Sequence, residues 1–202
     1  MSSRHFQWLK ASLFLLCLGP LASLIYGVLT DSLGANPIEA LTRGLGDWAL
    51  RFLLITLAVT PLRRLAGLDW LLRLRRMLGL FAFFYACLHF TSYLWLDQFF
   101  DWAEIGKDIV KRPFISIGFA SFLLLIPLAI TSNNAMIRRL GGRRWRQLHR
   151  VVYAIAMFAV LHYWWMVKQD ITQPVLYAVA LAGLLGVRLY WAIPRAGAVR
   201  EM

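Results

Sequence analysis

The sequence predicts an all-α integral membrane protein: a bundle of six transmembrane helices with both termini in the cytoplasm. Two observations predict this class. Hydrophobic residues make up 60% of the 202 residues and charged residues only 16%, whereas about a quarter of a soluble domain is charged. The apolar residues also gather in six runs of about twenty residues, the length that a helix needs to cross the hydrocarbon core of a bilayer.

The six runs follow one another along the chain without an internal repeat, so we expect a single domain over residues 1–202. Sequences typical of turns lie between the runs, such as DSLGANP, NN before Ala135, and GG at 141–142. Pro20, Pro61 and Pro127 are expected to mark kinks or helix ends. The predicted spans are residues 10–29, 48–66, 77–96, 113–131, 147–167 and 174–193.

Charge sets the expected orientation, because Lys and Arg are enriched in cytoplasmic loops. With the N-terminus inside, sixteen of the 22 basic residues lie on the cytoplasmic side. Acidic residues show the reverse bias, since only Asp69 and Glu201 are inside. The inner basic residues include Arg195 and Arg200 near the C-terminus. The basic residues expected outside are Arg43, Arg51, Lys107, Lys111, Arg112 and Lys168.

The same features exclude several classes of protein. The net charge of +12 does not indicate nucleic-acid binding, because the basic residues lie in short loops and form no face interleaved with aromatic residues. Arg4 and Lys10 precede the first apolar run as in a signal peptide. That run is long for a signal peptide and no clean cleavage site follows, so we expect an uncleaved span. The sequence contains no C-x-x-C-H motif for covalent c-type haem.

Two of the four histidines lie at matching depth inside predicted spans. His89 lies 13 residues beyond Arg76, the last basic residue before its span, and His162 lies 13 residues beyond His149. At about 1.5 Å per residue, both are about 20 Å from the cytoplasmic ends of their helices. An ionisable residue inside a span usually faces the interior of the bundle and marks a functional site.

Two imidazoles at one depth are the ligand set of a bis-histidine b-type haem, because neutral imidazole binds iron and a helix bundle can hold a flat macrocycle. A haem with both axial positions filled mainly moves electrons. The alternative is that each histidine is a hydrogen-bonded packing residue and that the aromatic residues nearby form an interfacial belt. These aromatic residues are Phe83, Phe84, Tyr85, Phe90, Tyr93, Tyr163, Trp164 and Trp165.

The role of His149, near the inner face, stays open. A second haem would need a partner about 13 residues before His89, where Arg75 and Arg76 stand. On an ideal helix, His149 and His162 point about 140° apart, unless tilt or a π-type irregularity reduces that angle. His149 is therefore a ligand of a second haem with another partner, part of a quinone or flavin site, or an interfacial residue within a basic cluster.

Two long motifs carry these histidines. RRMLGLFAFFYACLHFTSY contains His89, and RRWRQLHRVVYAIAMFAVLHYWW, preceded by TSNNAM, contains His149 and His162. Both resemble the MsrQ family (formerly YedZ), the haem-binding membrane subunits of the bacterial periplasmic methionine sulfoxide reductase system MsrPQ. The resemblance extends from Trp8 to the last span, and LGANPIEALTRGLGDWAL is similar to the family's first outer loop. More distantly, the core is similar to the ferric-reductase and NADPH-oxidase transmembrane domain.

The resemblance implies a function that spacing alone does not. The family passes electrons across the bacterial inner membrane to MsrP, a periplasmic molybdopterin enzyme that reduces methionine sulfoxide in oxidised proteins. Sulfoxide reduction itself belongs to that partner. The electrons are expected from the quinone pool or a cytosolic flavin reductase, and the family is associated with haem b and FMN. Carried over, His89, His149 and His162 match the family's ligand positions; one haem is expected and a second stays open.

We therefore expect electrons to enter near His149 and to leave toward MsrP on the outer side. Arg51 is a candidate to pair with a haem propionate, because a guanidinium matches a carboxylate in geometry. The alternative is that Arg51 extends its charge to the membrane interface. The acidic segment 97–108 is either a region that steers the partner or a solvated loop.

Two other classes of function stay open. One is a membrane reductase of the NADPH-oxidase or ferric-reductase type, which the sequence disfavours because it contains no nicotinamide- or FAD-binding domain. The other is a transporter or scaffold without a cofactor. A purified, colourless protein from haem-replete cells would establish that last class.

Overall fold

The computed structural model describes residues 3–167 and 169–193, and all regular structure in these ranges is helical, as predicted. Lys168, Arg195, Arg200 and Glu201, which contribute to the predicted charge asymmetry, lie outside the described residues. A 3-10 turn at Asp69–Leu71 precedes α3, and a π-helical turn at Tyr93–Asp97 follows it. The α-helices are α1 (Ser3–Leu29), α2 (Pro37–Ala66), α3 (Leu72–Ser92), α4 (Trp102–Lys111), α5 (Pro113–Ile130), α6 (Asn134–Leu140), α7 (Gly142–His149), α8 (Val152–Met166) and α9 (Thr172–Ala192).

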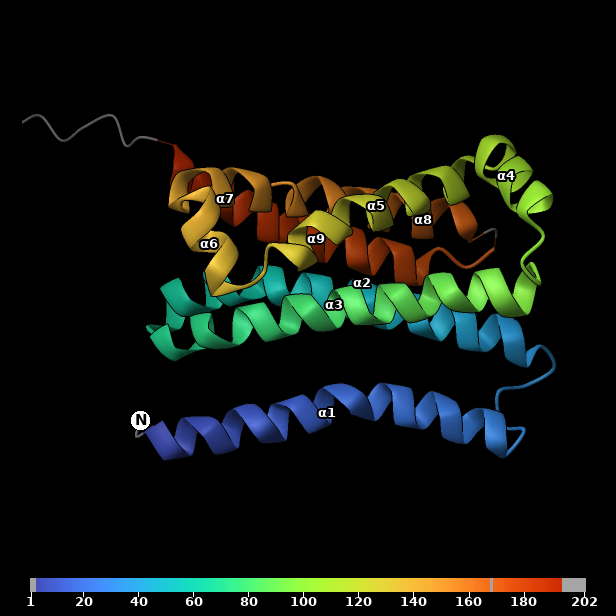
Figure 1. Ribbon diagram of the computed structural model, residues 1–202, viewed down its shortest axis with the longest axis horizontal. Coiled ribbons are helices and arrows are strands. Elements are labelled where there is room, and N and C mark those ends of the chain that lie inside the picture. The colour runs from blue at the N-terminus through green and yellow to red at the C-terminus, as the bar shows by residue number, and fades with distance from the viewer. Residues whose placement is uncertain (1–2, 168, 194–202) are drawn as a thin grey trace, which may run out of the picture.

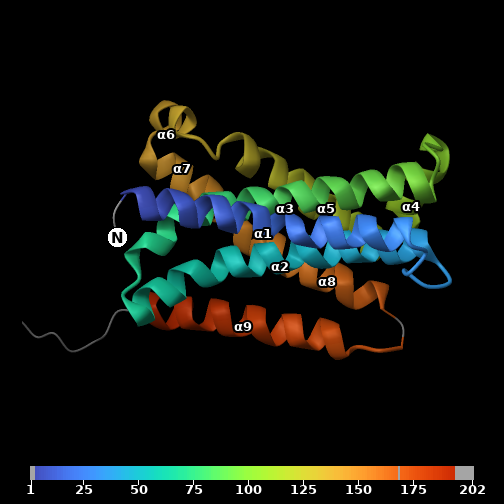
Figure 2. The same ribbon diagram turned by 90° about the horizontal axis from the view of Figure 1, so that it is seen from below.

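The long helices run lengthwise between two ends of the bundle (Figures 1 and 2). One end, called here the arginine-rich end, contains the start of α1, the connection from α2 to α3, the helices α6 and α7, and the end of α9. The opposite end, called the acidic end, contains the connection from α1 to α2, the helix α4 and the start of α9. The segments predicted to share the cytoplasmic side therefore lie together at the arginine-rich end.

Within the part of the chain that the structure describes, five helical segments are long and apolar enough to cross a membrane, so the chain is a multi-pass membrane protein. They are Arg4–Leu29, Pro37–Ala66, Asp69–Asp97, Pro113–Ile130 and Thr172–Ala192. The remaining predicted span, 147–167, is divided: α7 ends at His149, a turn follows at residues 150–151, and α8 has 15 residues. At about 1.5 Å per residue α8 is about 22 Å long, which is less than the roughly 30 Å of hydrocarbon.

The start of α2 lies eleven residues before the start of the predicted second span at Trp48. The side chain of Asn36 accepts a hydrogen bond from the backbone N–H of Glu39 at 3.2 Å, and Pro37 occupies the first helical position. Asn at the cap and Pro at the first position both favour a helix start. The stretch that resembles an outer loop of the family is therefore largely helical.

The acidic segment 97–108 is largely helical, so the loop part of its interpretation was wrong, although most of its residues are exposed to solvent. Asp101 caps α4 by accepting hydrogen bonds from the backbone N–H groups of Ala103 and Glu104 at 3.0 and 3.1 Å. Asp108 on the same helix is only 8% exposed. The segment thus forms a helix at the acidic end with one carboxylate packed inward.

Gly141 and the three prolines, which were expected to mark turns, kinks or helix ends, lie in different kinds of structure. Gly141 has a φ of 75° and separates α6 from α7, as the GG motif indicated. Pro20, Pro61 and Pro127 lie inside α1, α2 and α5, so none of them ends a helix. Neighbouring helices can satisfy the carbonyls that such prolines free.

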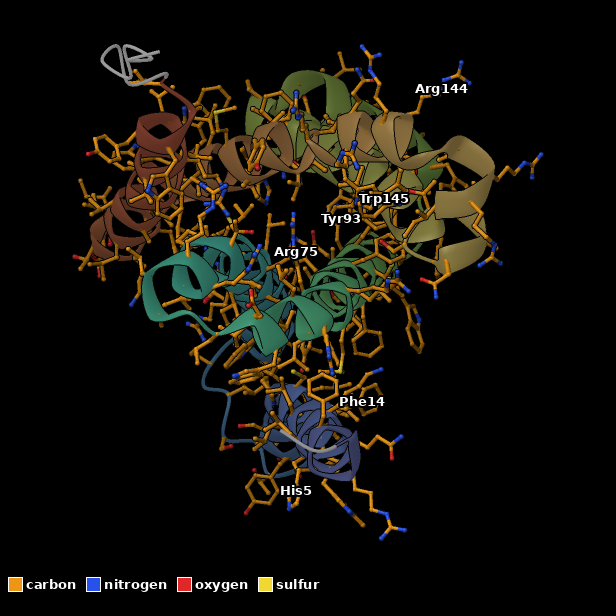
Figure 3. All side chains as sticks on the ribbon, turned by 90° about the vertical axis from the view of Figure 1, so that its left-hand side faces the viewer. His5, Phe14, Arg75, Tyr93, Arg144 and Trp145 are labelled. Atoms are coloured by element: carbon orange, nitrogen blue, oxygen red, sulfur yellow. The ribbon has the colours of Figure 1, made fainter. Side chains whose placement is uncertain are left out.

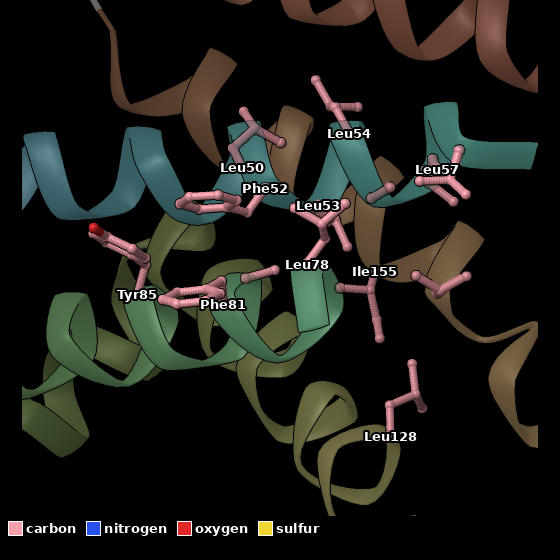
Figure 4. Close-up of a cluster of buried hydrophobic side chains, with 14 of the residues drawn as sticks. Leu50, Phe52, Leu53, Leu54, Leu57, Leu78, Phe81, Tyr85, Leu128 and Ile155 are labelled. Carbon is pink, nitrogen blue, oxygen red and sulfur yellow. The ribbon is translucent and has the colours of Figure 1, made fainter. Parts of the chain in front are cut away.

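The apolar core lies between α2, α3 and α8 (Figure 4). Phe52 on α2 stacks on Phe81 and on Tyr85 of α3, with ring centroids 5.6 and 5.2 Å apart. Leu57 on α2 and Ile155 on α8 are fully buried. Close packing of this kind makes these helices a rigid frame for any group held between them.

Tyr85 also joins α1 to the core. Its hydroxyl donates a hydrogen bond to the carbonyl of Cys17 at 2.8 Å and accepts one from the backbone N–H of Leu21 at 3.0 Å. In a regular helix this carbonyl and this N–H pair with each other. The hydroxyl therefore bridges two backbone groups of α1 from the neighbouring helix α3.

We expect Tyr85→Phe to lower the free energy of unfolding by only about 1 kcal/mol, because the two backbone groups of α1 can then pair with each other. Tyr85→Ala should cost about 3–5 kcal/mol, because it also leaves a cavity. Unfolding of the detergent-solubilised chain measures both values. If both variants lost the same free energy of unfolding, the ring would contribute nothing beyond the hydroxyl, and this prediction would be wrong.

Candidate functional site

His89 on α3 and His162 on α8 face each other inside the bundle, although 72 positions separate them in the sequence. Their ring centroids are 6.2 Å apart, and the ring planes cross at 71°. Both residues line the same cavity. The matching depth predicted from helix rise therefore corresponds to a close approach of the two imidazoles.

Each ring is held by a backbone carbonyl on a neighbouring helix. Nδ1 of His89 lies 2.8 Å from the carbonyl oxygen of Thr42 on α2, and Nδ1 of His162 lies 2.6 Å from that of Phe114 on α5. Since a carbonyl can only accept, each Nδ1 carries the proton and donates it. The other nitrogen, Nε2, then has a free lone pair, as a metal ligand requires.

The two histidines line a cavity with mostly apolar walls. Its volume is about 250 Å³. Its walls come mainly from α5 and from the three core helices α2, α3 and α8. Such a lining suits a flat apolar ring system with a few polar attachment points. The apolar wall residues include Leu50, Leu53, Ala82, Ala86, Phe90, Phe119, Phe122, Leu125, Ile155 and Ala159.

The rim of this cavity at the acidic end is charged. Arg43 and Asp47 on α2, together with Asp97 and Arg112, line this rim. Arg43 forms an ion pair with Glu39 one turn before it on α2. Among the described residues, the cavity therefore has an apolar interior and a rim that carries both arginines and carboxylates.

Near this side of the cavity, Asp108 ties α4 to the segment that follows α3. Its carboxylate accepts hydrogen bonds from the hydroxyl of Tyr93 and from Nε2 of Gln98, both at 3.3 Å. The guanidinium of Arg112 lies 3.1 Å from the same carboxylate. The cluster fixes Arg112, one of the two rim arginines, against the bundle.

Arg51, the candidate chosen from sequence, points elsewhere. Its Nε donates a hydrogen bond to the hydroxyl of Tyr177 on α9 at 2.8 Å, and its guanidinium lies over the ring of Trp48. An oxygen of Asp47 lies 3.9 Å away. Arg51 is not among the residues that line the cavity, because α2 directs it toward α9.

His149 lies apart from the two facing histidines, near the arginine-rich end. Its Nε2 is 3.0 Å from the hydroxyl oxygen of Thr131, and its ring stacks on Trp145 with centroids 4.0 Å apart. Figure 3 looks onto this end and shows Arg75 between α3 and the helices α7 and α8. Within residues 3–167 and 169–193, no group of three His, Cys, Asp or Glu side chains could hold a metal ion.

Several parts of the site were missed from the sequence: the two rim arginines, the carbonyls of Thr42 and Phe114, and two cavity glycines, Gly46 and Gly118, which lie against the imidazole rings. Arg43 and Thr42 were missed because α2 was started too late. The Asn36–Pro37 cap was the available signal for the earlier start. The backbone acceptors carry no sequence signal, because every residue has a carbonyl.

Comparisons with known proteins show which proteins this chain is similar to. Residues 45–173 match the family described as ferric reductase like transmembrane component. The chain is 61% identical to the protein-methionine-sulfoxide reductase heme-binding subunit MsrQ of Herminiimonas arsenicoxydans, over 91% of this chain and 85% of that protein. It is 58% identical to the MsrQ of Azospira oryzae, over 92% and 80%. It is 55% identical to the MsrQ of Rhodospirillum rubrum, over 92% and 89%.

Proposed function

The chain belongs to the MsrQ family of heme-binding subunits, and we propose that it carries electrons across a bacterial inner membrane to a periplasmic methionine sulfoxide reductase. Membership of this family, with its ferric-reductase-like transmembrane component, supports an electron-transfer role in a membrane. The observation that carries the proposal is the pair of facing imidazoles, His89 and His162, with both Nδ1 atoms held by carbonyls.

The spacing of these rings fits one metal ion between them. Two metal–nitrogen bonds of about 2 Å, with ~1.2 Å from each nitrogen to its ring centre, give a centroid separation of about 6.4 Å. The observed separation is 6.2 Å. A haem b held by His89 and His162 would supply one-electron transfer, since both of its axial positions are filled.

The rim arginines fit the carboxylate edge of such a group. Arg43 and Arg112 line the cavity at the acidic end, whereas the opposite walls are apolar. Guanidinium groups pair well with carboxylates, so these two side chains would hold the propionates. Arg51 does not line the cavity and lies beside Asp47 instead. Arg43 is therefore the arginine of α2 that can reach a group bound in the cavity.

For the topology we propose six crossings with both termini in the cytoplasm. The segment of α8 runs lengthwise through the bundle beside α5 (Figure 1). The positive-inside rule then assigns the arginine-rich end to the cytoplasm, and the histidine pair lies nearer the periplasmic end. The turn at residues 150–151 and the last residues of α7 extend α8 toward the inner face.

For the electron donor we propose the arginine-rich end. His149 and Trp145 form a stacked pair there, and Arg188 lies over the ring of Tyr153 at 5.7 Å. Aromatic and cationic side chains of this kind suit a quinone, an FMN, or the flavin of a cytosolic reductase. We also propose, as a further role at this end, that His149 binds a second haem. The side chain beside its Nε2 is then Thr131, and no second histidine faces it among the described residues.

For the electron acceptor we propose an MsrP-like molybdopterin subunit on the acidic end. The surface there contains α4, with Asp101 and Glu104 exposed. The same helix carries Lys107, which forms an ion pair with Glu104, and the exposed Lys111, so this surface offers charges of both signs to a docking partner. The sulfoxide reduction belongs to that partner, and this chain acts as the electron-transfer subunit.

The test measures haem and flavin per chain in the full-length protein, purified in detergent from haem-replete cells. We expect close to one b-type haem with a low-spin spectrum. We also expect a quinol or a reduced flavin to reduce it, and an MsrP-like subunit with methionine sulfoxide to reoxidise it. A colourless chain, or a reduced chain that the periplasmic subunit leaves reduced, would overturn the proposal. Steady superoxide production without that subunit would favour an oxidase.

His149 provides a separate prediction. Because His149 lies outside the cavity, His149→Ala should leave the low-spin spectrum of the histidine pair unchanged. We expect reduction by quinol or flavin to slow by about tenfold or more, as for the loss of one well-placed contact of about 1.4 kcal/mol. Stopped-flow absorbance measures this rate. A variant reduced at the parent rate would remove His149 from the donor site.

A further inference from the structure

The two histidines are held in the same way by two different helix pairs. His89 on α3 reaches the carbonyl of Thr42 on α2, four residues before Gly46. His162 on α8 reaches the carbonyl of Phe114 on α5, four residues before Gly118. In both cases, therefore, the acceptor carbonyl and the glycine stand one helical turn apart on the same face of the neighbouring helix.

Both glycines lie directly against the rings. A Cβ atom on Gly118 would lie 2.6 Å from Nδ1 and 2.8 Å from Cε1 of His162. A Cβ atom on Gly46 would lie 3.0 Å from Nδ1 and 3.1 Å from Cε1 of His89. The first pair of distances is too short for any side chain and the second is tight, so each ring occupies the space of the missing side chain.

Two other helix glycines also lie close to a side chain: a Cβ atom on Gly27 of α1 would lie 2.5 Å from Leu33, and one on Gly44 of α2 would lie 2.8 Å from Leu24. Those neighbours are the ends of flexible leucine side chains, which can shift. A Cβ atom on Gly79 of α3 would lie 3.5 Å from Thr56, an ordinary contact, and Gly183 and Gly186 of α9 have nothing within 4 Å. Among the helix glycines that the structure describes, Gly46 and Gly118 are therefore the two that lie against an imidazole ring.

The contact has a chemical consequence. In a regular helix the carbonyl of Thr42 accepts from the N–H of Gly46, and that of Phe114 from the N–H of Gly118. An imidazole can share the second lone pair of that carbonyl only if it comes close to the helix backbone. A bare glycine permits that approach. The Nδ1 hydrogen bond then fixes the tautomer, the ring orientation and the basicity of Nε2.

We propose that Gly46 and Gly118 are positioning residues: with the carbonyls of Thr42 and Phe114 they form two matching clamps that set the tautomer and the plane of each axial imidazole. The inference rests on the proposed haem ligation. It adds that the crossing of the ring planes, 71°, is set by α2 and α5 and not by the helices that carry the histidines.

The test introduces Gly118→Ala and Gly46→Ala separately into the full chain, with Gly183→Ala and Gly186→Ala as matched controls in a helix. Haem content is measured, together with the EPR spectrum and reduction potential of the ferric protein. A large angle between axial ring planes gives a strongly anisotropic low-spin EPR signal, and a smaller angle gives a more rhombic one. Packing changes that leave the rings in place would not move this signal.

We expect Gly118→Ala to have the larger effect, because its Cβ comes closer to the ring. Its haem affinity should fall by about 10–100-fold, as when other partners of metal-binding histidines are lost. The EPR signal should become more rhombic, and the reduction potential should rise, because a ligand without its Nδ1 hydrogen bond stabilises ferric iron less. Gly46→Ala should show the same changes in smaller degree, and the two controls none.

A second measurement uses the wild-type chain. It therefore gives a result even if the glycine variants fail to fold. In protein labelled with ¹⁵N-histidine, pulsed EPR should detect, on the remote nitrogen of both ligands, a hydrogen-bonded proton that exchanges only slowly with solvent. A remote nitrogen without a proton, or one exposed to bulk exchange, would overturn the clamp.

The two proposals fail in different ways. Unchanged EPR spectra and potentials in both glycine variants, while His89→Ala and His162→Ala lose the haem, would overturn the clamp and leave the proposed function standing. Full haem content in both histidine variants would overturn the proposed function itself.

Discussion

Replacing either His89 or His162 with alanine is expected to remove the same low-spin haem. The two rings face each other at 6.2 Å, so each would occupy one axial position of a single iron. A site with one remaining ligand loses both the bond and the low-spin state. Because even indirect partners of metal ligands are worth about 10–100-fold in affinity, we expect loss of the ligand itself to exceed 100-fold. Haem per chain and the optical spectrum measure this effect.

Alanine at these positions should leave the fold intact, because both rings lie at the cavity and outside the Phe52–Phe81–Tyr85 stack. The unfolding temperature of each variant, measured without haem, checks that point. Added imidazole should partly restore the low-spin spectrum in the space left by the missing ring. If each single variant kept a complete low-spin spectrum, the two histidines would not share one iron.

The pairing of His89 with His162 was predictable because it depends only on helix rise and chain direction. Two crossings that run in the same direction start from a basic cluster at one end, and an equal number of residues brings each histidine to the same depth. Rise says nothing of rotation about the helix axis. The sequence therefore predicted the depth of both rings, while their facing orientation depends on how α3 and α8 pack against α2 and α5.

The errors around α2 have a common physical origin. Apolar count placed the start of the second span at Trp48, whereas the cap at Asn36 starts the helix at Pro37. The early turns of α2 are polar. Arg43 in these turns lines the cavity, and the carbonyl of Thr42 accepts the hydrogen bond from His89. Hydropathy detects contact with lipid and does not detect a polar helix face turned toward a cofactor.

The sequence also did not predict that the segment 147–167 is divided into two helices. His149 and His162 were placed on one helix with a rotation of about 140° between them, but the turn at residues 150–151 separates α7 from α8. Nothing in RRWRQLHRVVY is a strong breaker. The stacking of His149 on Trp145 and its contact with Thr131 favour the bend through tertiary packing, which local propensity does not encode.

Removing the two rim arginines is expected to have the second-largest effect on cofactor retention. A hydrogen bond to a charged group contributes about 1.5–3 kcal/mol when buried. The side chains of Arg43 and Arg112 are 51% and 55% exposed, so solvent screening places each contribution at the lower end. This corresponds to about tenfold in haem affinity for each of Arg43→Gln and Arg112→Gln. The double variant should lose about a hundredfold, measured by transfer of haem to an apoprotein acceptor.

Loss of either arginine should lower haem affinity for a second reason. Arg43 is paired with Glu39, and Arg112 is paired with Asp108. Removing either arginine frees a carboxylate beside the proposed propionates, and like charges repel. Arg51→Gln is the matched control: it removes the same charge from α2, but its side chain bonds to Tyr177 and lies off the cavity. A greater loss of haem in Arg51→Gln than in Arg43→Gln would restore the assignment made from sequence. Equal retention in all three variants would mean that the carboxylate edge faces the apolar walls instead.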